Sequence, residues 1–167
     1  MKYPESLSAE LIAPCGMDCG ACSRHLRAKD SCDGCRSEAS VKPKYCAVCR
    51  IRNCETLGAG GADFCFECEK FPCARLRQLD KRYRTRYGMS MIENLGAIRD
   101  RGLASFIASE KERWRCPACG ALIRVHKDAC IHCGHARDET GKTTIAAASG
   151  TSNTTHPTRD RGLQGGP

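Results

Sequence analysis

The number and spacing of the cysteines constrain the fold of this chain more than any other feature. Fifteen of the 167 residues are cysteine, and twelve of these fall into six C-x2-C pairs. Two thiolates at this spacing can chelate one ion from a single tight turn, and two such turns complete a tetrahedral site. The pairs are Cys19/Cys22, Cys32/Cys35, Cys46/Cys49, Cys65/Cys68, Cys116/Cys119 and Cys130/Cys133. The sequence therefore predicts a fold that is held together by metal–cysteine sites.

The cysteines are predicted to bind metal rather than to form disulfides. The N-terminal run MKYPESLSAELIAP has no continuous apolar stretch after its lysine, so it does not resemble a secretion signal. An odd number of cysteines without an export signal favours metal ligation over a disulfide framework. No stretch of the sequence approaches the eighteen or more apolar residues of a membrane span. We therefore expect a cytoplasmic protein with no membrane partner.

Composition supports a structural role for the metal. Only 5% of the residues are aromatic, and small domains with thin apolar cores usually need staples such as structural metals. The formal net charge of +8 is misleading, because each four-thiolate zinc centre carries a charge of −2. Three such centres would leave a net charge of about +2. The remaining basic excess lies in residues 74–115, which hold eleven basic and five acidic side chains.

Four segments can be separated along the chain. Residues 1–73 form a cysteine-rich metal-binding region, and residues 74–114 a helical segment expected to pack on it. Residues 115–136 are expected to form a zinc ribbon. Residues 137–167 are rich in Thr, Ser, Gly and Pro, which predicts a disordered tail. The predicted fold class is a small, metal-stabilised α+β fold of short helices and zinc-knuckle turns, with a C-terminal zinc-ribbon hairpin.

The helical segment has clear start and stop signals. Within residues 76–87, apolar side chains recur at spacings of three, four and four, which predicts a helix that ends at Gly88. Ser90 followed by Glu93 is a capping box, so a second helix is expected to begin there. Gly102 is expected to end this second helix, and a third helix follows it.

The C-terminal run RCPACGALIRVHKDACIHCGH carries the most specific metal-binding signal. A glycine follows the second cysteine of each of its two turns, where the backbone must curl so that amides can point at sulfur. Between the turns, Leu122, Ile123 and Val125 are sufficient for a short hairpin. The arrangement resembles the zinc-ribbon family. The four ligands would be Cys116, Cys119, Cys130 and Cys133.

The eleven N-terminal cysteines allow more than one allocation to metal sites. A first set reproduces the ribbon pattern with a shorter connector: Cys19, Cys22, Cys32 and Cys35. Spacing permits a second set of Cys65 and Cys68 with either Cys46 and Cys49 or Cys49 and Cys54. Two sites use eight thiolates and leave three, and on spacing alone these three would include Cys15 and Cys73.

Four runs, IAPCGMDCGAC, CDGC, CRIRNC and FCFECEKFPCARL, resemble the family called domain of unknown function 3795. This family comprises cysteine-rich bacterial and archaeal proteins without an established activity. The resemblance spans roughly Ile12 to Leu76 and continues weakly into the ribbon. It implies a cytoplasmic, zinc-binding protein and supplies no catalytic residue. It also implies that the second set is Cys49, Cys54, Cys65 and Cys68, with Cys46 as an addition.

These features favour a zinc-dependent interaction module that presents surfaces to another macromolecule, with a protein as the expected partner. Closed four-cysteine sites have no open coordination position, so they hold structure and cannot activate water. About three zinc ions are expected. The chain offers no argument for a particular enzyme class, and a binding role is favoured over an enzymatic one.

Nucleic-acid binding through the basic helix 75–86 is an alternative. Six cations on one short helix could follow phosphates: Arg75, Arg77, Lys81, Arg82, Arg84 and Arg86. Few aromatic residues are placed for base stacking, however, and the arginines have a nearer role in neutralising the thiolates. A solvated or internally paired basic face is therefore favoured over a nucleic-acid site.

An iron–sulfur protein with a redox function is a second alternative, because thiolate-only sites accept iron as well as zinc. Cys15, Cys19 and Cys22 have the C-x3-C-x2-C spacing used by radical S-adenosylmethionine enzymes, but the chain lacks the length and strand–helix alternation of their barrel. An unligated thiol at Cys15 or Cys73 could also be reactive, and Cys73 opens the arginine-rich helix. A ligand or a buried cysteine is the favoured interpretation of both.

Overall fold

The computed structural model describes residues 2–38, 42–58 and 60–137. Within these ranges the protein is small and helical, and its β-structure is limited to three isolated bridges. The tail expected to be disordered, 137–167, lies outside the described residues apart from Arg137. None of the described helices is long and apolar enough to cross a membrane.

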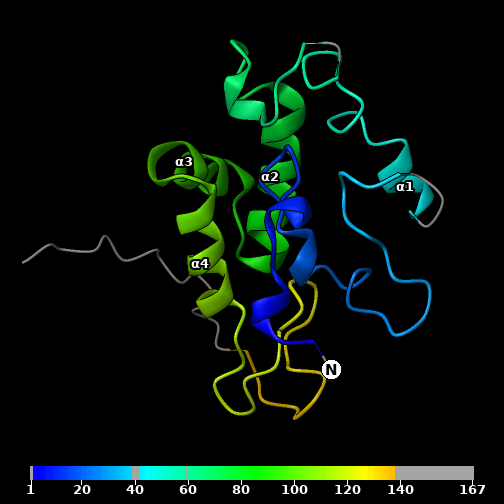
Figure 1. Cartoon of the computed structure of the whole chain (residues 1–167), viewed down its shortest axis with the longest axis vertical. Helices are drawn as coiled ribbons and strands as arrows, with labels where there is room; N and C mark the ends of the chain where they lie inside the picture. Colours follow the sequence, from blue (N-terminus) through cyan, green and yellow to red (C-terminus); the bar gives the residue numbers. More distant parts are fainter. Residues whose placement is uncertain (1, 39–41, 59, 138–167) are drawn as a thin grey trace, which may run out of the picture.

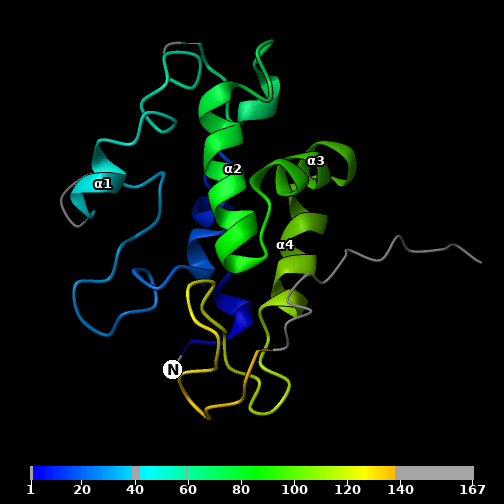
Figure 2. The ribbon, with the colours of Figure 1, turned by 180° about the vertical axis from the view of Figure 1, so that it is seen from behind.

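Four α-helices organise the described part of the chain. They are α1 (Lys44–Ala47), α2 (Ala74–Tyr87), α3 (Met91–Arg101) and α4 (Leu103–Arg113). Short 3-10 helices precede α2: η1 (Pro4–Ser6), η2 (Ala9–Leu11), η3 (Cys19–Ala21) and η5 (Cys65–Glu67). Helix α2 runs through the middle of the molecule, with α3 and α4 on one side and the segment that carries α1 on the other (Figures 1 and 2).

The corner between α2 and α3 confirms the predicted helix ends. Gly88 follows α2 in the left-handed conformation, with φ of 62°. The Ser90 hydroxyl accepts a hydrogen bond from the Glu93 amide at 3.1 Å, as an N-cap should. The same hydroxyl donates at 2.7 Å to the buried carboxylate of Asp80, which also accepts from the Ile92 amide at 3.0 Å. Asp80 therefore fixes the start of α3 against α2.

One hydrophobic core joins segments that are far apart in the sequence. Ile12 from the N-terminal region, Leu95 from α3 and Phe106 from α4 are all fully buried in a single cluster. The same cluster includes three residues that lie between the C-terminal cysteine pairs: Leu122, Ile123 and Val125. The C-terminal cysteine module is therefore packed into the core that the helices form.

A buried polar group lies at the end of α4. The indole Nε1 of Trp114 donates to a carboxylate oxygen of Glu110 at 2.7 Å, and Arg113 pairs with the other oxygen at 3.3 Å. Asp18 is also fully buried. Burial, with the negative charge of Glu110 nearby, raises the pKa of Asp18 to about 7. The loop of Asp18 and the end of α4 therefore contribute acidic groups to the same buried region.

The hairpin expected in the ribbon does not form as strands in the described residues. Two isolated bridges take its place, Arg115 with Leu122 and Ala129 with Ala136. The amide of Ile123 donates to the carbonyl of Trp114 at 2.7 Å, and the amide of Val125 donates to that of Ala21 at 2.9 Å. The Ile123 bond adjoins the Arg115–Leu122 bridge, whereas the Val125 bond leaves the ribbon for the N-terminal region, so the pairing stays too short to form strands.

Candidate metal centres

The four C-terminal cysteines form a compact tetrad. The sulfur atoms of Cys116 and Cys133 are 3.6 Å apart, and those of Cys119 and Cys130 are 3.7 Å apart. All four sulfur atoms lie within 4.8 Å of one another. Tetrahedral zinc with Zn–S bonds of about 2.3 Å requires sulfur atoms roughly 3.8 Å apart. The tetrad can therefore hold a metal ion without rearrangement.

Two equivalent turns build this tetrad. In the first, the Gly120 amide donates to the Cys116 carbonyl at 2.8 Å; in the second, the Gly134 amide donates to the Cys130 carbonyl at 2.9 Å. Both glycines have positive φ, 72° and 74°, a conformation that residues with a Cβ rarely adopt. The glycine that follows each cysteine pair, noted in the sequence, is therefore required by the backbone of the turn.

Backbone amides prepare the first thiol of the tetrad for ligation. Burial of Cys116 would raise the pKa of its thiol, but the backbone N–H groups of Cys119 and Ala118 and the neighbouring thiols of Cys119 and Cys133 lower it below its ordinary value. Thiolate is the form that binds metal, so this environment favours ligation.

Seven of the N-terminal cysteines line a cavity of about 630 Å³ beside α2, which we call the larger thiol cavity because it holds more cysteines. Helix α2 supplies part of the wall through Leu79, Arg82, Tyr83, Arg86 and Tyr87. The cysteines are Cys15, Cys19, Cys22, Cys32, Cys35, Cys46 and Cys49. The structure therefore places the predicted first set around one space, together with three further thiols.

The other four N-terminal cysteines line a separate cavity of about 640 Å³ at the N-terminal end of α2, which we call the four-thiol cavity. They are Cys54, Cys65, Cys68 and Cys73. Burial, with the neighbouring thiols of Cys73, Cys54, Cys68 and Cys49, raises the pKa of Cys65 to about 12. A cation bound among these sulfur atoms would reverse that shift, because it favours thiolate.

The two cavities divide the second predicted set, which was Cys49, Cys54, Cys65 and Cys68. Cys49 lines the larger thiol cavity, and Cys73 lines the four-thiol cavity with the other three. Outside the ribbon, no three potential ligand atoms among the described residues lie within 4.8 Å of one another. Which N-terminal thiols share a metal therefore stays a prediction. The C-x4-C spacing of Cys68 and Cys73 is the sequence feature that could have indicated that these two cysteines lie together.

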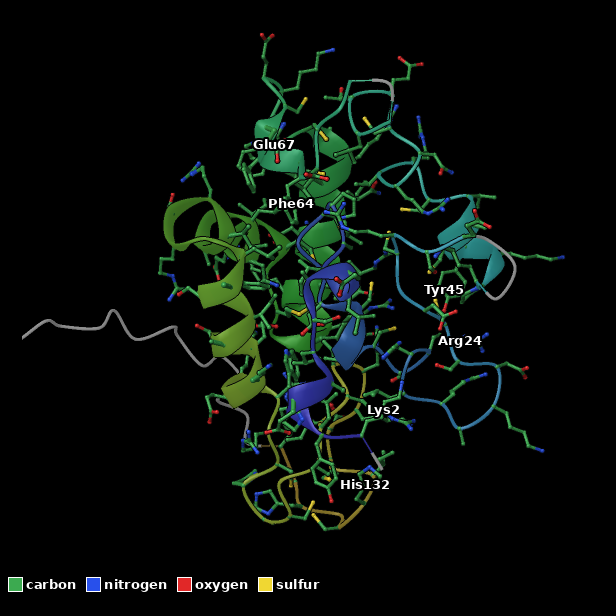
Figure 3. All side chains as sticks on the ribbon, viewed as in Figure 1. Lys2, Arg24, Tyr45, Phe64, Glu67 and His132 are labelled. Carbon is green, nitrogen blue, oxygen red and sulfur yellow. The ribbon has the colours of Figure 1, made fainter. Side chains whose placement is uncertain are left out.

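The turn that carries Cys65 and Cys68 is anchored by its own side chains. The Glu67 carboxylate accepts hydrogen bonds from the amides of Phe64 and Asp63, both at 3.1 Å. The Cys65 amide donates to the carbonyl of Pro14 at 2.9 Å, which connects this turn to the loop before the larger thiol cavity. In Figure 3, Phe64 and Glu67 lie near the N-terminal end of α2, and His132 lies in the ribbon at the opposite end.

The six predicted cations of α2 are all exposed, but they do not form one free surface. Arg84 pairs with Asp80 at 3.3 Å and with Glu93 at 3.2 Å. Arg82 and Arg86 line the larger thiol cavity. Arg75 lines the four-thiol cavity and donates to the Arg50 carbonyl at 3.4 Å, so four of the six have partners or neighbours within the protein. The role of these arginines beside thiolates stays a prediction.

Comparison with known proteins identifies the cysteine-rich region only. Residues 11–78 match the family described as protein of unknown function (DUF3795), which confirms the resemblance found in the sequence. All eleven N-terminal cysteines lie inside this match, and the ribbon lies outside it. No curated protein and no solved structure matches the chain.

Proposed function

We propose that this chain, whose residues 11–78 match a family of unknown function, is a zinc-dependent interaction module that binds another protein. The observation that carries the proposal is the ribbon tetrad, whose four sulfur atoms lie within 4.8 Å of one another. Four thiolates close the coordination shell of zinc, so the ion serves the fold rather than a reaction. The two equivalent glycine-containing turns support a zinc-ribbon type of site.

Three groups of cysteines lie along α2, so three metal centres are proposed, of which the ribbon tetrad is assigned to zinc. The four-thiol cavity is lined by residues at the N-terminal end of the helix, and the larger thiol cavity by residues farther along it. The ribbon lies near the C-terminal end of the helix (Figure 1). At that end His126 contacts α2, with its Nε2 atom 3.3 Å from the Tyr83 hydroxyl. Fifteen thiols persist in this state only in a reducing compartment, so the proposed location is the cytoplasm.

The proposed partner surface is α1 and its surroundings. Among the described residues, Tyr45 and Val48 are the most exposed large apolar side chains, at 68% and 71%. Tyr45 lies in α1 and Val48 directly follows it. Helix α1 lies on the side of α2 opposite α3 and α4 (Figure 1), and Figure 3 shows Tyr45 there. Tyrosine is enriched at protein interfaces because it combines apolar area with a polar group. A protein partner is favoured over nucleic acid, since the α2 cations are partly engaged internally.

Zinc occupancy of the ribbon can be measured directly. We expect the double substitution Cys119→Ser/Cys133→Ser to lose about one zinc per chain in elemental analysis, because two of four ligands are removed. His132→Ala is the matched control: this exposed residue lies between two ligands but completes no coordination, so zinc should be retained. Equal zinc in the wild type and the double variant, or iron in the ribbon of the wild type, would contradict the proposal.

Partner binding can be tested by cross-linking in native extract followed by affinity capture. We expect the double substitution Tyr45→Ala/Val48→Ala to reduce the captured partner by about tenfold, as for loss of interface anchors. Tyr3→Ala removes another exposed aromatic side chain, at 49%, and should leave capture unchanged. Each sample is divided and one half treated with nuclease. Capture that disappears with nuclease, or that is equal in all variants, would overturn a protein partner at α1.

A further inference from the structure

The four-thiol cavity brings together cysteines that are separated by up to nineteen positions in the sequence, from Cys54 to Cys73. Cys65 and Cys68 come from the turn at η5, and Cys73 is the residue that precedes α2. Cys54 lies in a separate loop. Its amide donates a hydrogen bond to the Ile51 carbonyl, and its carbonyl accepts one from the Leu57 amide. The cavity therefore has four sulfur ligands from three separate pieces of backbone.

The spacing of these sulfur atoms differs from that of the ribbon in the same molecule. The ribbon sulfurs approach to 3.6 and 3.7 Å, as a single ion requires. In the four-thiol cavity no three sulfur atoms lie within 4.8 Å of one another, although all four cysteines line one space of about 640 Å³. Thiolates that bind different irons of a cluster lie farther apart than those on one ion, because iron and sulfide fill the space between them.

We propose that Cys54, Cys65, Cys68 and Cys73 bind a [4Fe–4S] cluster. Clusters of this type are held by four cysteine thiolates, and the cavity offers four. The assignment replaces Cys49 by Cys73 in the second predicted set and leaves Cys49 with the larger thiol cavity. It does not depend on the zinc or the partner of the ribbon proposal, because it uses none of the ribbon cysteines.

The charges around the cavity suit an anionic cluster. A [4Fe–4S] core with four thiolates carries a net negative charge, and the cavity wall includes three cations, Arg50, Lys70 and Arg75, against one carboxylate, Glu55. Arg75 is held there by a hydrogen bond from its guanidinium to the Arg50 carbonyl at 3.4 Å. Helix α2 starts at Ala74, directly after the ligand Cys73, so the positive end of its dipole faces the same site.

The remaining wall of the cavity is largely apolar. Ile51 and Leu76 are buried, with exposed fractions of 8% and 1%, and Leu57 and Phe71 are partly buried beside them. A hydrophobic shell limits the access of water to a metal site and so protects a cluster from loss of iron. The cavity therefore combines four thiol ligands, compensating cations and an apolar surround.

The cluster is tested first on protein purified without oxygen. We expect a brown protein with a broad absorption band at about 400 nm, and a loss of about four iron and four sulfide per chain in Cys73→Ala relative to the wild type. Cys46→Ala is the matched control, because Cys46 lines only the larger thiol cavity and should leave the iron of the four-thiol cavity in place. Colourless wild-type protein whose N-terminal region contains zinc would overturn the cluster.

Residue-resolved alkylation tests the allocation. In Cys73→Ala, we expect Cys54, Cys65 and Cys68 to become modified at least tenfold faster, as ligands released from one site, while Cys116 stays protected and reports an intact fold. In Cys49→Ala, the same three cysteines should stay protected. Release of Cys54, Cys65 and Cys68 by Cys49→Ala but not by Cys73→Ala would overturn the assignment. Cys73→Ser is the second variant, used if the alanine variant also exposes Cys116.

Discussion

Removal of metal from the ribbon is expected to abolish the folded state of the helical core as well as that of residues 115–136. Cys116 and Cys130 are buried members of the same cluster as Leu95 and Phe106. Metal binding to such sites contributes roughly 10–16 kcal/mol to folding, which exceeds the usual net stability of about 5–15 kcal/mol. The chain without metal should therefore have no stable native state.

Trp114 provides the measurement for this prediction. It is the single tryptophan of the chain, it is 1% exposed, and its carbonyl accepts a hydrogen bond from Ile123 between the cysteine turns. We expect a chelator under reducing, oxygen-free conditions to shift Trp114 fluorescence to the red and to remove the cooperative melting transition. Added zinc should restore both signals. A chelated protein with unchanged circular dichroism and melting would show that packing alone maintains the fold.

The substitution Gly16→Ala is expected to lower stability by about 3 kcal/mol or more, through two separate causes. Gly16 has φ of 84°, a conformation that costs energy for any residue with a Cβ. A Cβ at this position would also lie 2.7 Å from the carbonyl oxygen of Met91 and 2.9 Å from Leu95. The loop could relieve this overlap only by leaving α3, which would break the hydrogen bond from Asn94 to the Gly16 carbonyl at 2.8 Å.

Thermal unfolding of the metal-loaded protein checks this prediction, with an expected fall in the midpoint of roughly 10 °C. Gly96→Ala, on the same helix α3, is the control of opposite sign. A Cβ at Gly96 meets nothing within 4 Å, so alanine should stabilise the helix by about 0.5–1 kcal/mol. If Gly16→Ala left the midpoint unchanged while Gly96→Ala raised it, the close contact between the first cysteine loop and α3 would be wrong.

The helices were predictable because their signals are local. The spacing of apolar residues in 76–87, the cap at Ser90 and the glycines at 88 and 102 correspond to the observed ends of α2 and α3. The grouping of the ribbon cysteines was predictable because the two turns, each followed by a glycine, are separated by only ten residues. The predicted hairpin is reduced to isolated bridges, because the Val125 amide donates to the carbonyl of Ala21 in a distant segment.

The amino-acid order alone therefore predicted that metal–thiolate sites support the fold, and it located the helices and the four cysteines of the ribbon tetrad. The distribution of the other eleven thiols over two cavities depends on the path of the folded backbone. Cys73 reaches Cys54 only because α2 begins beside the η5 turn, and Cys49 faces the larger thiol cavity instead. Spacing constrains ligands within one turn, whereas the pairing of turns is set by long-range packing.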